Sequence, residues 1–290
     1  MKIAGFTIVR NAIKYGYPVV ESIKSILPLC DKVYVAVGSS EDATLELVRS
    51  IAPEKIEIIE TVWDDSLREG GRVLAVETDK AFDAIPKDYD WCIYIQADEV
   101  LHEKDFPALR AAMQSYKDAT EVEGLLFKYL HFWGTYDYVG VSRNWYRQEI
   151  RIVKNNKNIR SYRDAQGFRL DGRKLKVKKV EATVYHYGWV RPPEVIKRKI
   201  SDFNALWHSG EELKRKQEES QSFDYSEINA VKVFEGTHPA VMQNFISSLD
   251  WHVDIDPSIS KFSFKEKLLF AFERAFNYRL FEYKNYKVLK

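Results

Sequence analysis

Two adjacent carboxylates, Asp98 and Glu99, come shortly after an apolar run in the sequence. The run, Trp91 to Ile95, is rich in β-branched and aromatic side chains, which is typical of a buried strand. Carboxylates at the end of a buried strand are costly to desolvate unless a cation or strong hydrogen bonds accompany them. In an open α/β sheet, the carboxyl edge is also where ligands bind. We therefore predict a metal and phosphate site here; the alternative is a strand that ends in a charged turn.

Strands and helices alternate with short connections through the first hundred residues. Apolar, β-prone runs predict strands over 2–9, 32–37 and 55–62, and helical periodicity predicts helices over 18–27, 43–51 and 72–85. This order predicts a parallel, doubly wound sheet with right-handed crossovers. Its ligand edge collects polar side chains from several strand ends: Arg10, Asn11, Ser39, Asp64, Asp65, Arg72, Asp98 and Glu99. The sequence contains neither GxGxxG nor GxxxxGK[ST], so the usual dinucleotide and P-loop signatures are missing.

Beyond residue 105 this alternation stops. We expect a helix over 106–116 and strands over 123–133 and 145–153, with a loop dense in Tyr and Gly between the two strands. The clearest helix of the chain begins at Arg191-Pro192-Pro193-Glu194, because proline suits the first turn of a helix. Its buried stripe is predicted to contain Val195, Ile196, Lys199, Ile200, Phe203, Leu206 and Trp207.

The segment DWCIYIQADE resembles the strand and acidic motif of the family-2 glycosyltransferases with the GT-A fold. FTIVRN, VYVAVGSSEDAT and Arg72 occur in the order that this fold requires, and the resemblance covers roughly residues 1 to 210. It implies an α/β fold of the GT-A (Rossmann-like) type, with a mixed, mostly parallel sheet flanked by helices. It also implies that a DxD-type motif holds Mn2+ or Mg2+ against the diphosphate of a nucleotide-sugar donor. Such a cation neutralises the charge that builds up on the leaving phosphate.

The resemblance also implies roles for individual residues. The donor-binding residues are expected to be Thr7, Val9, Arg10, Asn11, Ser39, Arg72, Gln96, Ala97 and Asp98. The expected metal ligands are Asp98, Glu99 and His186, although His186 also fits a buried, hydrogen-bonded aromatic cluster. An acidic residue after the metal motif should act as the catalytic base; Asp164 is our first candidate, Glu149 the second and Asp137 the third. His131, Trp133, Tyr136 and Tyr138 are expected beside the acceptor sugar, unless they belong to the core.

The sequence departs from the family pattern at two positions. Gln96 stands where the family often has an aspartate, so Asp98, with Glu99, is left to supply the metal carboxylates. The aspartate that contacts the donor base near Val37 or Gly38 is also missing, which leaves the base identity open. Gln96 can still form a hydrogen bond with a ribose hydroxyl.

The implied domain organisation has a boundary near residue 210. Residues 1–104 are the nucleotide-binding half and 105–210 the acceptor half of a GT-A domain, and 211–290 form a helical C-terminal extension. The charged run 211–222 is predicted to be an exposed helix or a linker. The tail from Phe262 mixes apolar residues with Lys and Arg, so it fits either a helix on a membrane surface or a helix packed on the core, and we favour packing.

Composition narrows the range of partners and locations. A net charge of +1 argues against nucleic acid as the main partner. No apolar run approaches the ~20 residues that span a bilayer, and the first residues lack the features of a secretory signal. Cys30 and Cys92 are too few for a metal cluster, and they fit a reducing cytosol. We therefore expect a cytoplasmic protein whose one membrane contact would be peripheral, through the C-terminal tail.

Taken together, these features predict a metal-dependent, inverting glycosyltransferase that moves a sugar from a nucleotide donor to a glycan, lipid or protein hydroxyl. One alternative is a nucleotidyltransferase built on a similar sheet. The other is a related binding or scaffold protein that has lost catalysis, which Gln96 and the missing base-contact aspartate support.

Overall fold

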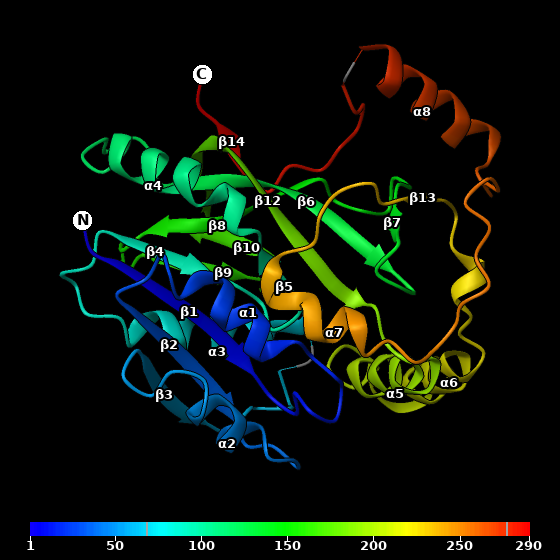
Figure 1. Cartoon of the computed structure of the whole chain (residues 1–290), viewed down its shortest axis with the longest axis horizontal. Coiled ribbons are helices and arrows are strands. Elements are labelled where there is room, and N and C mark those ends of the chain that lie inside the picture. Colours follow the sequence, from blue (N-terminus) through cyan, green and yellow to red (C-terminus); the bar gives the residue numbers. More distant parts are fainter. Residues whose placement is uncertain (68, 277) are drawn as a thin grey trace.

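The computed structural model describes residues 1–67, 69–276 and 278–290, and a large mixed sheet forms its centre (Figure 1). The strands of this sheet are β1 (Ile3–Val9), β2 (Lys32–Gly38), β3 (Ile56–Thr61), β4 (Trp91–Tyr94), β5 (Glu99–Leu101), β6 (Gly124–Trp133), β7 (Tyr138–Gly140), β8 (Gln148–Lys154), β12 (Lys176–Trp189), β13 (Val231–Val233) and β14 (Lys287–Val288). The main path runs in the order β13-β7-β6-β8-β4-β1-β2-β3, and β12 pairs with β5, β6 and β14. Strands β1 to β4 are parallel along this path, whereas β8 is antiparallel to both β4 and β6.

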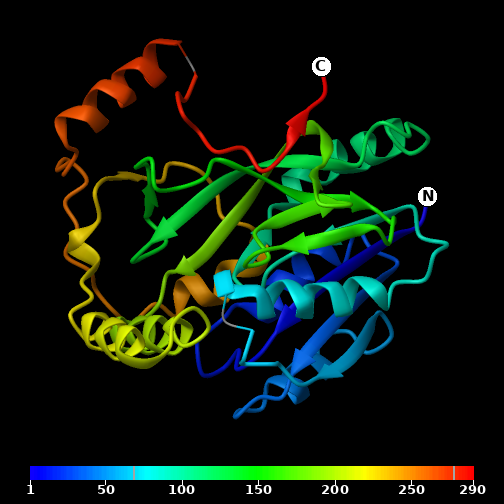
Figure 2. The same ribbon diagram turned by 180° about the vertical axis from the view of Figure 1, so that it is seen from behind.

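Helices cover both faces of the sheet (Figures 1 and 2). One face packs against α1 (Val19–Ile26), α2 (Thr44–Arg49) and α4 (Phe106–Ser115) in a single apolar cluster. The opposite face packs against α3 (Arg72–Asp83) and a small sheet of β9 (Ile159–Tyr162), β10 (Gly167–Leu170) and β11 (Arg173–Lys174). Short 3-10 helices lie at Glu69–Gly71, Glu103–Asp105, Tyr225–Glu227 and Ala240–Met242. The predicted architecture of a mixed sheet flanked by helices is confirmed.

The elements predicted for the first hundred residues are also confirmed, and their ends differ from the structure by at most two residues. β1 is buried along its whole length because a parallel neighbour lies on each side and side chains cover both faces. Strands in this position are therefore uniformly apolar rather than alternating.

The direction in which the sheet is built reverses at β1. The chain passes from β1 to β2 and β3 through α1 and α2 on one face, and then returns through α3 on the other face to β4, on the far side of β1. In open α/β sheets, ligands bind at the carboxyl ends of the strands at such a reversal. Here those ends are Val9 of β1 and Tyr94 of β4.

The C-terminal residues contain the expected helices but are joined to the central sheet. After α5 (Pro193–Asn204), the chain forms α6 (Gly210–Gln221), α7 (Gln243–Ser247) and α8 (Phe264–Phe276). β13 pairs with β7 and β14 pairs with β12, so residues 211–290 contribute two short strands to the sheet. The domain boundary near residue 210 stays a prediction.

The expectation that the tail packs on the core is wrong for α8. None of the side chains described in this helix is buried, and it lies at the outside of the molecule (Figure 1). Its contact with the body includes ion pairs of Glu273 with Arg143 and Arg147. The chain after it does pack, because Arg279, Asn285 and Tyr286 are buried. No helix among the described residues has both the length and the apolar character needed to cross a bilayer.

A buried ion pair connects the strand that follows Asp98 to the centre of the sheet. Glu99 of β5 and Arg151 of β8 are both 0% exposed. Arg151 Nε donates to Glu99 Oε2 and Arg151 Nη2 donates to Glu99 Oε1, both at 2.7 Å. The Tyr129 hydroxyl donates to Oε1 at 2.8 Å, and the backbone amide of Gln96 donates to Oε2 at 3.1 Å. Such a two-pronged arginine–carboxylate pair holds both groups in one geometry.

We expect the Arg151→Met variant to lose about 3–5 kcal/mol of unfolding free energy, because Glu99 would keep a buried charge without a partner. Urea unfolding measures this loss. The control is Arg49→Met, which breaks an exposed pair with Glu60 and should cost at most about 1 kcal/mol. A double variant, Glu99→Leu with Arg151→Met, should recover much of the loss because neither charge remains. Equal losses for Arg151→Met and Arg49→Met would contradict the interpretation.

Candidate functional site

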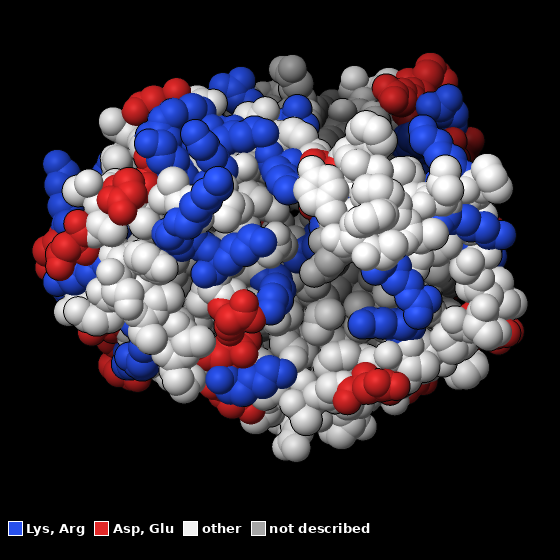
Figure 3. Space-filling model, turned by 90° about the horizontal axis from the view of Figure 1, so that it is seen from above, with Lys and Arg blue, Asp and Glu red and all other residues white. Residues whose placement is uncertain are grey.

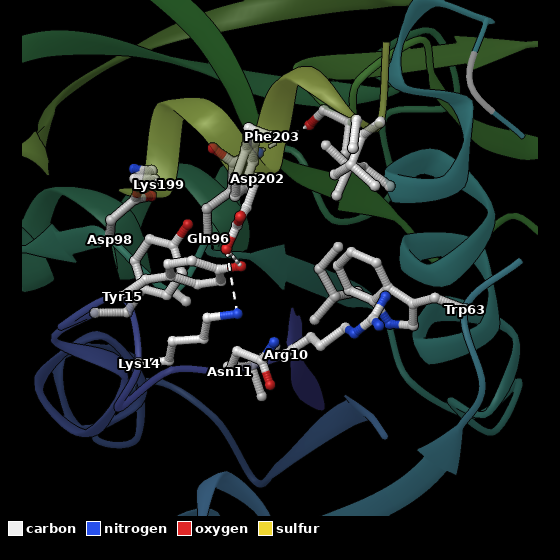
Figure 4. Close-up of a pocket in the computed structure, with 18 of the residues that line it drawn as sticks. Arg10, Asn11, Lys14, Tyr15, Trp63, Gln96, Asp98, Lys199, Asp202 and Phe203 are labelled. Carbon is white, nitrogen blue, oxygen red and sulfur yellow. Dashed lines mark hydrogen bonds and ion pairs between the residues drawn. The ribbon is translucent and has the colours of Figure 1, made fainter. Parts of the chain in front are cut away.

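A cavity of about 400 Å³ opens at the carboxyl ends of β1 and β4 (Figure 4). This volume is within the range of ligand pockets. The walls come from the end of β1, the segment before α1, the turn after β4, and α5. The residues that carry polar or aromatic groups into the cavity are Arg10, Asn11, Lys14, Tyr15, Tyr17, Glu41, Trp63, Asp65, Tyr94, Gln96, Asp98, Lys199, Asp202 and Phe203.

Asp98 lies at the inner end of this cavity, with 13% of its side chain exposed. Its Oδ2 atom is 3.4 Å from Lys199 Nζ and 3.8 Å from His186 Nε2. Burial by itself would raise the pKa of the Asp98 carboxyl, but nearby Lys199, His186 and Arg191 outweigh burial and lower this pKa to about 2. Asp98 is therefore a carboxylate at any physiological pH.

Lys199 reaches Asp98 from α5 (Figure 4). Its Nζ atom also donates to the Gly188 carbonyl oxygen at 3.0 Å and lies 4.9 Å from the centre of the Tyr17 ring. Burial lowers the pKa of the Lys199 amine to about 8, opposed by the Asp98 charge. Gly188 is required here because a Cβ atom at this position would lie 2.7 Å from Asp98 Oδ2 and 2.6 Å from His186 Nε2.

The outer part of the cavity is basic and aromatic. Arg10 Nη1 is 2.9 Å from Asp65 Oδ1, and the guanidinium lies over the Trp63 ring at 5.5 Å. Lys14 Nζ is 3.2 Å from Asp202 Oδ2, and the Tyr15 hydroxyl donates to the same oxygen at 2.8 Å. These contacts bring the segment after β1 against α5 and so close one side of the cavity.

Asn11 has a structural task in this segment. Its φ of 55° is in the left-handed region, where side chains other than Asn and Asp are rare. Its side-chain Oδ1 atom accepts from the backbone amide of Glu41 at 2.8 Å, and its backbone amide donates to Ser40 Oγ at 3.0 Å. Asn11 therefore ties the turn after β1 to the turn after β2.

Two of the expected site residues, Arg72 and Asp164, line a second cavity of about 750 Å³ instead. Asp79 and Trp207 are also part of its wall. Burial raises the pKa of the Asp164 carboxyl. Ala165, the residue after Asp164, lines the first cavity, so the two hollows are neighbours along this loop.

The remaining expected donor residues are divided between wall and core. Val9, Arg10, Asn11, Gln96, Ala97 and Asp98 line the first cavity. Thr7 is 0% exposed inside β1, and its hydroxyl donates to the Ile8 carbonyl. The Ser39 amide donates to the Thr61 carbonyl oxygen at 2.9 Å, so Ser39 holds the end of β2 against β3. Neither Thr7 nor Ser39 belongs to the two cavities described.

Of the three expected metal ligands, Asp98 and His186 lie together, whereas Glu99 is paired with Arg151 inside the sheet. Both carboxylate oxygens of Glu99 are engaged by Arg151, and no set of three His, Cys, Asp or Glu side chains among residues 1–67, 69–276 and 278–290 is arranged to hold a metal ion. His186 directs Nδ1 to His131 Nδ1 at 3.2 Å, which leaves Nε2 towards Asp98. The Asp98 oxygen that faces His186 already has the Lys199 ammonium beside it. A cation such as Mg2+ binds through one or two protein carboxylates and completes its shell with phosphate oxygens and water. Here the available carboxylate is Asp98, and the Lys199 ammonium already lies beside it, so this donor set suits a divalent cation poorly.

The expected acceptor residues lie in the aromatic core. His131 Nε2 donates to the Tyr146 carbonyl oxygen at 2.8 Å, and burial lowers the pKa of His131 to about 3. Trp133 donates to the Tyr225 carbonyl oxygen at 2.9 Å, and Tyr136 packs against Tyr187. None of the three lines either cavity described. Aromatic residues on buried strands pack with each other here.

Sequence reasoning overlooked Lys14, Tyr15, Tyr17, Lys199 and Asp202 as site residues. Lys199 did carry a signal, since it occupies a position in the otherwise apolar stripe of the helix after Pro193. A lysine in such a stripe needs an anionic or carbonyl partner once buried. The segment from Lys14 to Tyr17 carried no comparable signal, because its role depends on how α5 packs.

The second base candidate, Glu149, is buried in the sheet. It is 1% exposed, its Oε1 atom accepts from the Ile150 amide at 2.9 Å, and it lines neither cavity described. Burial raises the pKa of this carboxyl to about 7, opposed by the Arg151 charge and the Ile150 amide.

No family model and no curated protein matches this chain. Among solved structures, S. aureus TarS 1-349 in complex with UDP-GlcNAc is 13% identical with a TM-score of 0.37, and the match covers 76% of this chain and 72% of that one. In another S. aureus TarS structure, 14% identical with a TM-score of 0.36, the match covers 70% of this chain but only 39% of that one.

Two further matches concern other proteins. Glucosyl-3-phosphoglycerate synthase from Mycobacterium tuberculosis, in complex with Mn2+, UDP and glucosyl-3-phosphoglycerate, is 16% identical with a TM-score of 0.30, covering 46% of this chain and 45% of that one. The 4-diphosphocytidyl-2C-methyl-D-erythritol synthase from Anaerococcus prevotii is 11% identical with a TM-score of 0.38, covering 76% and 98%. TM-scores this low do not establish a family, and membership of glycosyltransferase family 2 is not shown.

The raised pKa of Glu149 predicts a particular pH dependence. Because the folded pKa is about 7 and the ordinary value 4.5, the native state holds a proton that the unfolded chain has released. Unfolding free energy should therefore fall by about 3 kcal/mol as pH rises from 4.5 to 7. Glu149→Gln should lack this fall, whereas Glu54→Gln at an exposed position should keep it. Urea unfolding at pH 5 and pH 8 measures the difference; parallel profiles for wild type and Glu149→Gln would contradict it.

Proposed function

We propose that this chain is a glycosyltransferase that moves a sugar from a nucleotide-sugar donor to a hydroxyl of a glycan, lipid or protein, with inversion at the anomeric carbon. The observation that supports it most is the cavity at the β1–β4 reversal, whose lining includes the cationic side chains Arg10, Lys14 and Lys199. Arg10 is paired with Asp65 and Lys14 with Asp202, while Lys199 lies beside Asp98. Cations in the lining of a cavity suit a diphosphate, which Arg and Lys bind through charge-assisted hydrogen bonds.

The aromatic groups of the cavity suit the nucleoside part of the donor. Trp63 and Tyr15 line the same cavity as the cations. Gln96 Nε2 makes two long contacts, 3.4 Å each, with the Tyr94 hydroxyl and the Ala165 carbonyl oxygen. A ribose hydroxyl would offer this amide a better partner, so we assign Gln96 to the ribose.

In this proposal, the acceptor hydroxyl attacks the anomeric carbon on the face opposite the diphosphate. The bond between that carbon and the phosphate oxygen breaks, and a nucleoside diphosphate leaves with the electron pair. Asp164 takes the proton of the hydroxyl, since it lies in the neighbouring cavity and burial raises its pKa, which improves a carboxylate as a base near neutral pH.

A screen of nucleotide-sugars tests the function. A donor present at 100 times its Kd should raise the unfolding free energy by about 2.7 kcal/mol, which thermal melting detects. The same donor should be converted slowly to free sugar and nucleoside diphosphate, with water as the acceptor. Asp164→Asn should keep the donor affinity within about twofold and lose about 10²-fold or more in turnover.

The other outcomes lead to three different conclusions. Release of pyrophosphate in place of a nucleoside diphosphate would indicate a nucleotidyltransferase. Donor binding without turnover, in the presence of every acceptor class, would indicate a binding or scaffold protein. Unchanged turnover in Asp164→Asn would remove Asp164 as the base and leave the function standing.

We also propose that the face of the molecule that carries α8 and the C-terminal tail, from Phe262 onwards, contacts an anionic membrane. Figure 3 shows this face: Lys and Arg gather over one part of it, and a broad uncharged area lies beside them. The described apolar residues of the tail with the greatest exposure are Phe264, Leu268, Phe276 and Phe281, at 84%, 64%, 67% and 88%. Lysines and arginines near a membrane surface are attracted by anionic lipids. A second copy on this face would bring two basic areas together, which like charges disfavour.

Sedimentation with vesicles tests the membrane contact. Vesicles of phosphatidylcholine with phosphatidylserine should carry the protein into the pellet, and vesicles of phosphatidylcholine alone should not, because the attraction needs anionic lipid. The double variant Phe264→Ser with Phe281→Ser should stay in the supernatant, whereas Val62→Ser, at an equally exposed apolar residue near the end of β3, should behave as wild type. Sedimentation without vesicles would indicate self-association and contradict the proposal.

A further inference from the structure

We infer that Lys199 is the cation that neutralises the leaving diphosphate, so that transfer in this site needs no divalent metal ion. The inference rests on the proposed function and concerns how that function is carried out. It is based on the side chains that surround Asp98, and on the positive charge that Lys199 places beside this carboxylate.

Lys199 is held in place by groups from three parts of the chain. Its ammonium donates to Asp98 Oδ2 at 3.4 Å and to the Gly188 carbonyl oxygen at 3.0 Å. The Tyr17 and Phe203 rings lie 4.9 and 5.7 Å from it. An ammonium has three donors, and these contacts use two of them. The third is available to a phosphate oxygen, since Lys199 lines the cavity.

A second buried cation lies close to the same carboxylate. Arg191 is 2% exposed and donates to the Tyr15, Tyr187 and Val190 carbonyl oxygens, while its Nη2 atom has no hydrogen-bond partner. Its charge contributes to the field on Asp98. Asp98 therefore has the Lys199 ammonium beside it, and the charge of Arg191, which lies outside the cavity lining, adds to the positive field on this carboxylate.

This balance of charge suits a diphosphate and opposes a metal ion. A divalent cation beside Asp98 would meet the Lys199 ammonium, which lies 3.4 Å from the same oxygen, in a poorly solvated site where like charges repel strongly. The charge of Arg191 would add to this repulsion. The divalent cation would have only Asp98 and His186 as protein ligands. A diphosphate brings the opposite charge and finds a fixed ammonium without the need to bind a cofactor first.

Asp98 then has a different task from the one that its motif implied. It positions the Lys199 ammonium at the inner end of the cavity, and it touches no metal. Gly188 supports this arrangement, because any side chain there would displace Asp98 and His186.

The test measures binding and turnover separately. Calorimetry with UDP and GDP, and turnover of the best donor, are carried out in EDTA and in Mn2+. We expect both quantities to agree within twofold in the two conditions. Lys199→Met, which keeps the apolar stem and removes the charge, should weaken nucleoside diphosphate binding at least tenfold and leave binding of the nucleoside without phosphates unchanged.

Two variants control for folding and for charge. Lys197→Met makes the same exchange on the same helix, at a lysine outside the cavity that pairs with the exposed Glu194, and should bind nucleoside diphosphate as wild type does. Lys199→Arg keeps a positive charge and should retain more affinity than Lys199→Met. Equal binding by Lys199→Met and Lys197→Met would overturn the inference.

The outcomes separate this inference from the function on which it rests. Turnover that EDTA abolishes and Mn2+ restores would overturn the role of Lys199 and leave the glycosyltransferase in place. Failure of both nucleotides and every donor to bind, in either condition, would overturn both proposals.

Discussion

The Glu99–Arg151 ion pair is the constraint on which the candidate site depends. It joins β5 to β8 across the position where the chain leaves β4 and turns, and the Gln96 amide is one of its donors. Buried charges of this kind are tolerated only when each finds partners in good geometry. Satisfying Glu99 therefore also fixes the turn that carries Gln96, Ala97 and Asp98 to the edge of the cavity.

The same region shows how close packing and charge act together. The Tyr187 amide donates to the Asp98 carbonyl oxygen at 2.8 Å, so β12 holds the backbone of the turn while the Asp98 side chain faces Lys199. Gly188 lets these groups approach, and Lys199 reaches them from α5. Elements far apart in sequence thus meet at one carboxylate.

Much of the fold followed from the sequence, because apolar runs and helical periodicity are local properties. The strands and helices up to β4, and Asp98 at the cavity, were predicted in this way. The pairing of Asp98 with Glu99 as two metal ligands was a weaker inference. Asp98 lies in the turn after β4, whereas Glu99 is the first residue of β5, so the two carboxylates have different surroundings and Glu99 is the one that is buried.

The arrangement of the remaining site residues could not be predicted, because it depends on contacts between segments that are distant in the sequence. The packing of α5 decides which basic residue lies beside Asp98. The packing of the aromatic residues decides whether Trp133 and Tyr136 face a ligand or the protein core. Arg72 and Asp164 reach the neighbouring hollow rather than the first one for the same reason. A buried lysine in an apolar helix stripe was the one local sign of this arrangement.

The position of α5 has a mechanical consequence. One helix carries Lys199, Asp202 and Phe203, which supply a cation, an anion and an apolar surface to the same wall. Since a helix moves as a rigid unit, a shift of α5 changes the width of the opening and the balance of charge inside it in a single step. An occupant that shifts the α5 backbone inwards therefore moves all three groups together, so fit and charge matching are coupled in this wall.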